Sequence, residues 1–214
     1  MKSVINFSLV LCLLALTGCD RTYYKTMEAF GKHKRDLLVD RVEDTRDSQE
    51  DVKEQFQTAL EKFSAVVNFD GGELKKKYTE LKAELARSES KTEAVRKNIK
   101  DVEDVSNALF TEWEAELEQY SNDELRRLSK SKLDQTRQQY AKLIGAMKRA
   151  EVKIEPVLSV FRDQVLFLKH NLNAQAVASL QDELVSVKAD IASLVKEMEV
   201  SIAEADAFIK AMAN

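Results

Sequence analysis

Residues 74–120 read LKKKYTELKAELARSESKTEAVRKNIKDVEDVSNALFTEWEAELEQY, and the spacing of their apolar side chains predicts one long supercoiled helix. Fourteen positions follow one another in strict steps of four and three residues, and ten of the fourteen are apolar. A seam with that period stays on one side of a helix and pairs with a neighbouring helix. The seam positions are Leu74, Tyr78, Leu81, Leu85, Ser88, Thr92, Val95, Ile99, Val102, Ser106, Leu109, Trp113, Glu116 and Tyr120.

Helices of the same kind are expected on both sides of this stretch. The first runs from about residue 22 to 69, and residues 68–72 end it because two glycines after an aspartate permit an abrupt reversal. The third opens at Ser121, which forms a capping box with Glu124. The fourth follows a turn at residues 171–173 and keeps a regular seam to Met212.

The last two helices complete the prediction of the fold. The third contains Pro156, where we expect a kink rather than a break because the seam stays in phase on both sides. Four long helices joined by short turns predict an all-α protein, an antiparallel up-down-up-down four-helix bundle of coiled-coil type. The third and fourth seams are Leu133, Thr136, Tyr140, Leu143, Met147, Ala150, Ile154, Val157, Phe161 and Leu168, and then Val177, Leu180, Leu184, Val187, Ile191, Leu194, Met198, Ile202, Ala205, Phe208 and Met212.

Polar and charged residues add two expectations about the alignment of neighbouring helices. A turn near Gly71 places Gln49 about level with Thr92, so that two polar seam residues would meet in one layer and fix the register. A turn near Ser121 brings four acidic residues beside four basic ones, and each group opposes its own helix dipole. The acidic group is Glu112, Glu114, Glu116 and Glu118, and the basic group is Arg126, Arg127, Lys130 and Lys132.

Composition and chemistry point away from an enzyme. Of the 214 residues 33% are charged, with one proline and five glycines, which is typical of long helices. The formal charge of -4 disfavours general nucleic-acid binding. His33 and His170 lie outside the Glu-x-x-His pattern of a di-iron bundle, and the glycines form no phosphate loop. We therefore expect no catalytic residue, no metal and no cofactor.

Residues 1–18 have the features of a secretory signal, with Lys2 as a positive start and an apolar run too short for the roughly 20 residues of a membrane-spanning helix. The motif Leu16-Thr17-Gly18-Cys19 resembles the lipobox of bacterial lipoproteins. In those proteins the cysteine receives diacylglycerol, the signal is cut before it, and the new N-terminus is acylated, for example with palmitate. The resemblance implies a membrane anchor at Cys19; the alternative is an ordinary buried thiol.

Residues 19–24 are then the lipidated anchor and a short tether, and residues 25–214 the elongated bundle domain. Asp20 resembles the inner-membrane retention signal of Gram-negative bacteria, which slightly favours the inner over the outer membrane of the cell envelope, with the chain facing the periplasm. Basic residues exceed acidic ones from Arg21 to Arg41. This segment has two equally supported interpretations: it lies near anionic lipid head groups, or it forms a solvated helix face.

An apolar band at residues 157–168 is wider than a coiled-coil seam. The favoured interpretation is a broader core, and the alternative is a partner-binding patch. The proposed topology places this band at the end of the bundle opposite Cys19, together with the turn at residues 68–72. The candidate partner surface there comprises Phe69, Leu166, Phe167, His170 and Asn171.

Three segments carry a resemblance to a family of uncharacterised bacterial lipoproteins, catalogued only as a domain of unknown function. They are residues 68–72 (NFDGG), 109–114 (LFTEWE) and 161–173 (FRDQVLFLKHNLN). The family has no assigned activity, so the resemblance implies location and fold alone.

We therefore expect a membrane-anchored, non-enzymatic scaffold, spacer or adaptor for an unknown envelope protein. One alternative is an envelope protein that binds a lipid surface. Another, less favoured, is an enzyme with an unconventional carboxylate site among the glutamates at 112–118. Homo-oligomers could also form, because a coiled-coil seam pairs as readily between chains as within one.

Overall fold

A computed structural model describes Met27 and residues 33–69 and 73–213. The signal peptide at 1–18, the cleavage motif and Cys19 lie outside the described residues, as does the expected start of the first helix, although Met27 is itself helical. All regular structure in the described residues is helical, in the elements α3 (Lys34–Val67), α4 (Leu74–Leu117), α5 (Asp123–His170), α6 (Ala174–Ser179) and α7 (Gln181–Ala213).

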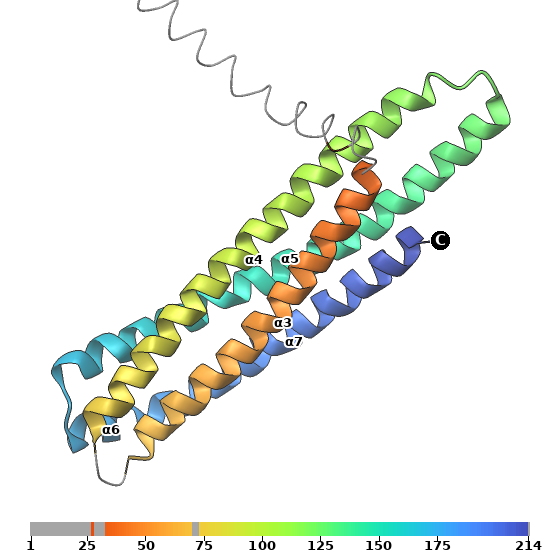
Figure 1. The fold of residues 1–214 in the computed structure, drawn as a ribbon. Coiled ribbons are helices and arrows are strands. Elements are labelled where there is room, and N and C mark those ends of the chain that lie inside the picture. The colour runs from red at the N-terminus through yellow and green to blue at the C-terminus, as the bar shows by residue number, and fades with distance from the viewer. Residues whose placement is uncertain (1–26, 28–32, 70–72, 214) are drawn as a thin grey trace, which may run out of the picture.

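The four long helices form an antiparallel bundle (Figure 1). Neighbours pack in the closed order α3 with α4, α4 with α5, α5 with α7, and α7 with α3, so each helix contacts two others. The predicted all-α bundle is confirmed. The short turns force each helix to run opposite to the one before it, and α5 alone, with 48 residues, spans about 70 Å at 1.5 Å per residue.

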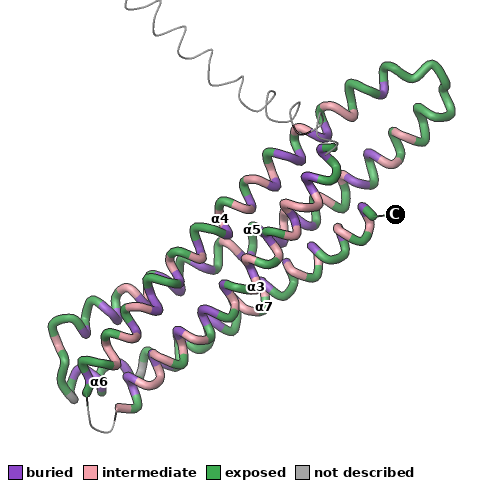
Figure 2. The backbone as a smooth tube through the Cα atoms, viewed as in Figure 1, coloured by how far each residue is buried: buried purple, intermediate pink, exposed green. Residues whose placement is uncertain are grey.

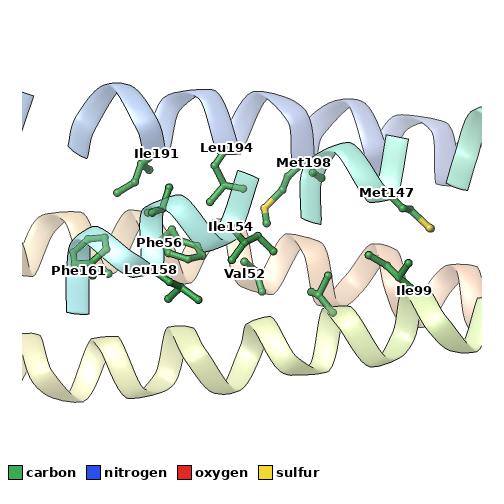
Figure 3. Close-up of a cluster of buried hydrophobic side chains, with 14 of the residues drawn as sticks. Val52, Phe56, Ile99, Met147, Ile154, Leu158, Phe161, Ile191, Leu194 and Met198 are labelled. Carbon is green, nitrogen blue, oxygen red and sulfur yellow. The ribbon is translucent and has the colours of Figure 1, made fainter. Parts of the chain in front are cut away.

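The seams form the core. Side chains from α3, α4, α5 and α7 meet on the bundle axis, where Figure 3 labels Phe56, Ile99, Ile154, Phe161 and Leu194 among others. Phe161 packs against two aromatic rings of α3, with centroid separations of 6.5 Å to Phe56 and 5.9 Å to Phe63. The buried C-terminal Met212 confirms that the last helix packs to its end.

The turn between α4 and α5 differs from the prediction in three respects. The last buried residue of α4 is Leu117, which is not a seam position. The seam positions Glu116 and Tyr120 are exposed, so the prediction that the seam pairs with a neighbouring helix up to Tyr120 is wrong. Trp113 is only partly buried. Asn122 rather than Ser121 caps α5, because its Oδ1 accepts from the backbone N–H of Glu124 at 2.9 Å and of Leu125 at 3.2 Å.

Two details of the later helices also emerge. The α5 helix runs through Pro156 without a break, and the proline ring lies on the exposed side, where the carbonyl that loses its intrahelical donor can be solvated. The predicted fourth helix is divided at Leu180 into α6 and α7. Asn173 caps α6 by accepting from the N–H of Ala176 at 2.9 Å, which confirms the predicted turn at residues 171–173.

The two ends of the bundle are built differently. At one end α3 begins and α7 ends: Lys34 Nζ lies 2.8 Å from Glu112 Oε1, and the Arg35 guanidinium donates to the carbonyl of Met212. In the described chain, α4 and α5 continue past these contacts as a two-helix hairpin (Figure 1). We call residues 113–132 the hairpin overhang. Most of its residues are exposed, as the green tube in Figure 2 shows.

Candidate functional site

The far end of the bundle, opposite the start of α3, carries the predicted partner surface. It is closed by the last turns of α5, by α6 and by the start of α7 (Figure 1). The fold places Leu166, Phe167 and His170 in these last turns and Asn171 at the helix end. Asn171 Nδ2 donates to the carbonyl of Phe167 at 2.9 Å and thereby holds the chain as it leaves α5.

The apolar band at residues 157–168 divides into two parts. Most of it is core, since five of its side chains are buried: Val157, Leu158, Phe161, Val165 and Leu168. Leu166 and Phe167 instead point outward, with 60% and 39% of their surfaces exposed. The broader core therefore accounts for the buried part of the band and leaves the outward pair unexplained.

One member of the predicted surface lies differently, and one apolar neighbour was missed. Phe69 is partly buried and packs against the core rather than joining an open patch. Leu172, in the turn after α5, is 39% exposed. The sequence could have identified Leu172 as an exposed apolar residue, because it lies between two asparagines of a predicted turn and turns are usually polar. The exposed set, which we call the far-end surface, consists of Leu166, Phe167, His170 and Leu172.

Charged groups of both signs are exposed near the far-end surface, since Asp163 lies one turn before Phe167 on α5 and Glu73 precedes α4. Lys169 precedes His170 at the end of α5, and Lys75 and Lys76 are exposed at the start of α4. Lysines in the last turn of a helix interact favourably with its dipole, which accounts for Lys169. The apolar side chains therefore define the far-end surface, because the charges around it have no single sign.

Two of the glutamates at 112–118 are held in ion pairs with other helices. Glu112 pairs with Lys34, and Glu114 Oε1 lies 2.6 Å from Arg137 Nη1. The hydrogen bond from Arg137 lowers the pKa of Glu114, whereas a general acid at neutral pH needs a raised one. The charge of Lys130 also lowers the pKa of Glu114, so the two groups that were predicted to lie side by side are close at this point, although Arg126 and Lys130 form their ion pairs with Asp123 and Asp134.

No three His, Cys, Asp or Glu side chains within the described residues gather closely enough to hold a metal ion. A surface hollow of about 490 Å³ lies between α4 and α5. Ion pairs between its lining residues cross it, namely Arg96 with Glu151 at 3.8 Å and Lys148 with Glu103. These side chains satisfy one another, so the hollow belongs to the packing of α4 against α5. In addition, none of the described helices is long and apolar enough to cross a membrane.

Two buried polar clusters were not identified from the sequence. In the first, Glu84 accepts a hydrogen bond from Gln55 Nε2 at 2.8 Å and two from Arg87, and these contacts lower the pKa of Glu84, with Arg87 as the main cause. In the second, Ser201 Oγ donates to Gln49 Oε1 at 2.8 Å, and Gln49 Nε2 is buried without a partner. The polar groups of Gln49 and Thr92, which were predicted to share a layer, bond elsewhere, because Thr92 Oγ1 donates to the carbonyl of Ser88 while Gln49 accepts from Ser201.

Comparison with known proteins adds one match. A family model described as a protein of unknown function (DUF2959) matches residues 23–212, which cover every described helix except the last residue of α7. Among curated proteins no match was found, and among solved structures there was none either.

Proposed function

The chain belongs to the DUF2959 family of proteins of unknown function, and from that premise we propose that it is a lipid-anchored scaffold or adaptor of the bacterial cell envelope. Lipid on Cys19 tethers one end of the bundle to a membrane. The far-end surface binds another envelope protein. The bundle is the rigid spacer between the two, and it carries out no chemical step.

The observation that carries this proposal is the exposure of Leu166 and Phe167 at the end of the bundle remote from α3's start. Adjacent apolar side chains that a monomer leaves in water mark interaction sites more often than isolated ones do. Their neighbours Val165 and Leu168 are buried, so the helix that presents the pair is held by the core. A partner would therefore meet a surface that is already ordered.

Chain length supports the tether. Lys34 follows Cys19 by fifteen residues, so the start of α3 stays within about 50 Å of a membrane-held cysteine even if the chain is fully extended. Two or more acyl chains hold a protein stably, whereas one chain gives marginal binding. The far-end surface would then stand up to about 70 Å farther away, given the length of α5.

The same proposal places the chain in the envelope of a Gram-negative bacterium, facing the periplasm. Asp20 slightly favours the inner membrane for the reason given above. Basic residues near the tether would strengthen contact with anionic lipid by about 1 kcal/mol each close to the surface.

The test is crosslinking in cells from a photoreactive residue at Phe167 in the lipidated protein, with exposed Lys196 of α7 as the matched control position. We expect an adduct with a second protein from position 167 and none from position 196. Equal adducts at both positions, or no adduct from position 167, would contradict the proposal that the protein is an adaptor. An adduct with the mass of two copies would instead make the far-end surface a homo-oligomer contact.

A substitution provides the functional counterpart of that test. With the photoreactive residue kept at position 167, Leu166→Asp places a charge beside it on the far-end surface and should abolish the adduct without unfolding the bundle. Val200→Asp, at a similarly exposed apolar position of α7, should leave it unchanged. If both substitutions or neither reduced crosslinking, the far-end surface would not be the binding site.

A further inference from the structure

The hairpin overhang exposes a second group of apolar side chains, at the end of the bundle where α3 begins. Tyr120, Leu125 and Leu128 are 39%, 52% and 62% exposed, and we call these three the tip surface. They are uncovered because α3 and α7 do not extend along the described overhang (Figures 1 and 2). We propose that the tip surface inserts into the outer layer of the lipid bilayer that holds Cys19, as a second membrane contact. This inference rests on the proposed function.

The overhang is a defined structure rather than a loose loop. Trp113 Nε1 donates to Ser129 Oγ at 2.8 Å and ties α4 to α5 across the overhang. The cap at Asn122 fixes the start of α5, and Asp123 pairs with Arg126 at 2.6 Å. Leu125 and Leu128 are therefore presented on an ordered helical turn, and no folding step is needed before they meet a surface.

The dimensions of the tip fit the interfacial region of a bilayer. Leu128 is five residues after Asp123, the first residue of α5, so the tip surface lies within about 8 Å of the hairpin's end at 1.5 Å per residue. Interfacial helices bury their apolar faces about 5–10 Å deep. A tyrosine at Tyr120 suits that boundary, because its ring is apolar and its hydroxyl can stay hydrated.

The position of the tether selects a membrane as the occupant. From Glu112, which contacts the start of α3, to Ser121 the overhang advances about 13 Å at 1.5 Å per residue. The fifteen residues from Cys19 to Lys34 can span that distance whether helical or extended. A membrane that holds Cys19 is therefore within reach of the tip surface.

Charge is not the main attraction at the tip. Three basic residues of the overhang are exposed, but five acidic ones are exposed as well, so its exposed charge is net acidic: Arg126, Arg127 and Lys130 against Glu114, Glu116, Glu118, Asp123 and Glu124. Insertion must therefore rest on the apolar side chains, which lose contact with water when they enter the acyl boundary. It should depend only weakly on the content of anionic lipid, unlike attraction by a basic segment.

The only tryptophan of the chain, Trp113, lies within the overhang and reports on it directly. The full lipidated protein would be reconstituted in zwitterionic vesicles whose head groups carry a spin-label quencher. We expect quenching of Trp113 fluorescence and loss of most of it in the variant Leu125→Glu/Leu128→Glu. In the control variant Val200→Glu, which places a charge at an exposed apolar position of α7, the fluorescence of Trp113 should be quenched as much as in the wild type.

Flotation of the same samples separates the two proposals. If the double variant floats with the vesicles but loses quenching, the tip contact is supported. If the wild type and the double variant float and quench equally, the tip contact is wrong while the tether stands. If the wild type does not float, the lipid anchor fails and the proposed function fails with it. A protein adduct from a photoreactive residue at Leu125 would overturn the membrane as occupant in favour of a protein or a second copy.

Discussion

The far end of the bundle and the hairpin overhang are made of the same repeating seam, yet they differ in what surrounds it. At the far end four long helices and α6 converge, and the rings of Phe56, Phe63 and Phe161 fill the space between them. In the described overhang α4 and α5 have only each other. Apolar residues of a coiled-coil pattern are thus core where partner helices accompany them and surface where those helices stop.

The largest expected effect is on the free energy of unfolding, which a substitution at the far end should lower much more than one in the overhang. Phe161→Ala removes a fully buried ring that touches two others, and should lower the free energy of unfolding by about 3–5 kcal/mol. Leu125→Ala in the overhang should change it by no more than about 0.5 kcal/mol, as is usual for exposed positions. Urea unfolding followed by circular dichroism measures both. Similar losses at the two positions would mean that the overhang is as much part of the core as the far end.

A smaller effect is expected at Glu84, on the α3–α4 side. Because its pKa is lowered in the folded state, its contribution to stability is present above its pKa in the unfolded chain and is lost as the pH falls through the folded value. Glu84→Gln removes the charge that Arg87 and Gln55 stabilise and should cost about 1–2 kcal/mol at neutral pH, a value reduced because Arg87 is half exposed.

The pH dependence gives that prediction its control. The difference in unfolding free energy between the wild type and Glu84→Gln should shrink on acidification, since protonation of Glu84 makes the two alike. Glu114→Gln in the overhang removes an exposed pairing and serves as the comparison, with little change expected at any pH. If the unfolding free energies of the wild type and Glu84→Gln differed by the same amount down to acid pH, the ionised carboxylate would not be the source of the stability.

Periodicity in the sequence predicted the helices, their antiparallel order and most of the core, because the period of a seam determines which side of a helix is buried. It did not predict which neighbour a polar seam residue would meet. The contact of Lys91 with Asp51 places Gln49 and Thr92 at about the same height, but Gln49 bonds to Ser201 of α7, because a residue on the axis is shared by several helices. The partner of such a residue depends on rotations of a few tens of degrees that the spacing does not encode.

The candidate surfaces were predictable to different degrees. Leu166 and Phe167 could be identified because they widen a seam that is otherwise narrow. The tip surface could not, because Tyr120 occupies a regular seam position and its exposure follows from where α3 begins and α7 ends. Relative helix length is a property of the whole assembly, and no single seam records it.

A stabilising change is expected at the buried Gln49. Its Nε2 has no partner, so the amide costs free energy that its single bond to Ser201 does not fully offset. The double variant Gln49→Leu/Ser201→Ala should raise the unfolding free energy by about 1 kcal/mol, because both polar groups leave together. Ser201→Ala alone should lower the unfolding free energy, because the buried amide of Gln49 would then have no hydrogen-bond partner at either atom. A double variant less stable than the wild type would show that the amide is satisfied, for instance by a buried water.

The smallest expected effect would separate the overhang from the rest of the bundle. Trp113→Phe keeps a large ring but removes the hydrogen bond to Ser129, so that α4 and α5 lose a tie worth about 0.5–1.5 kcal/mol. Amide hydrogen exchange should then accelerate at residues 113–117 and 123–132, while α4 amides between residues 92 and 109 keep their wild-type rates. Proteins open locally where few buried contacts hold a segment, and the exposed overhang is such a segment. Ser129→Ala removes the same bond from the other helix and should reproduce the pattern. If exchange rose equally along both helices, the overhang would unfold only together with the whole bundle. The far end and the overhang would then differ in the exposure of their side chains and not in local stability.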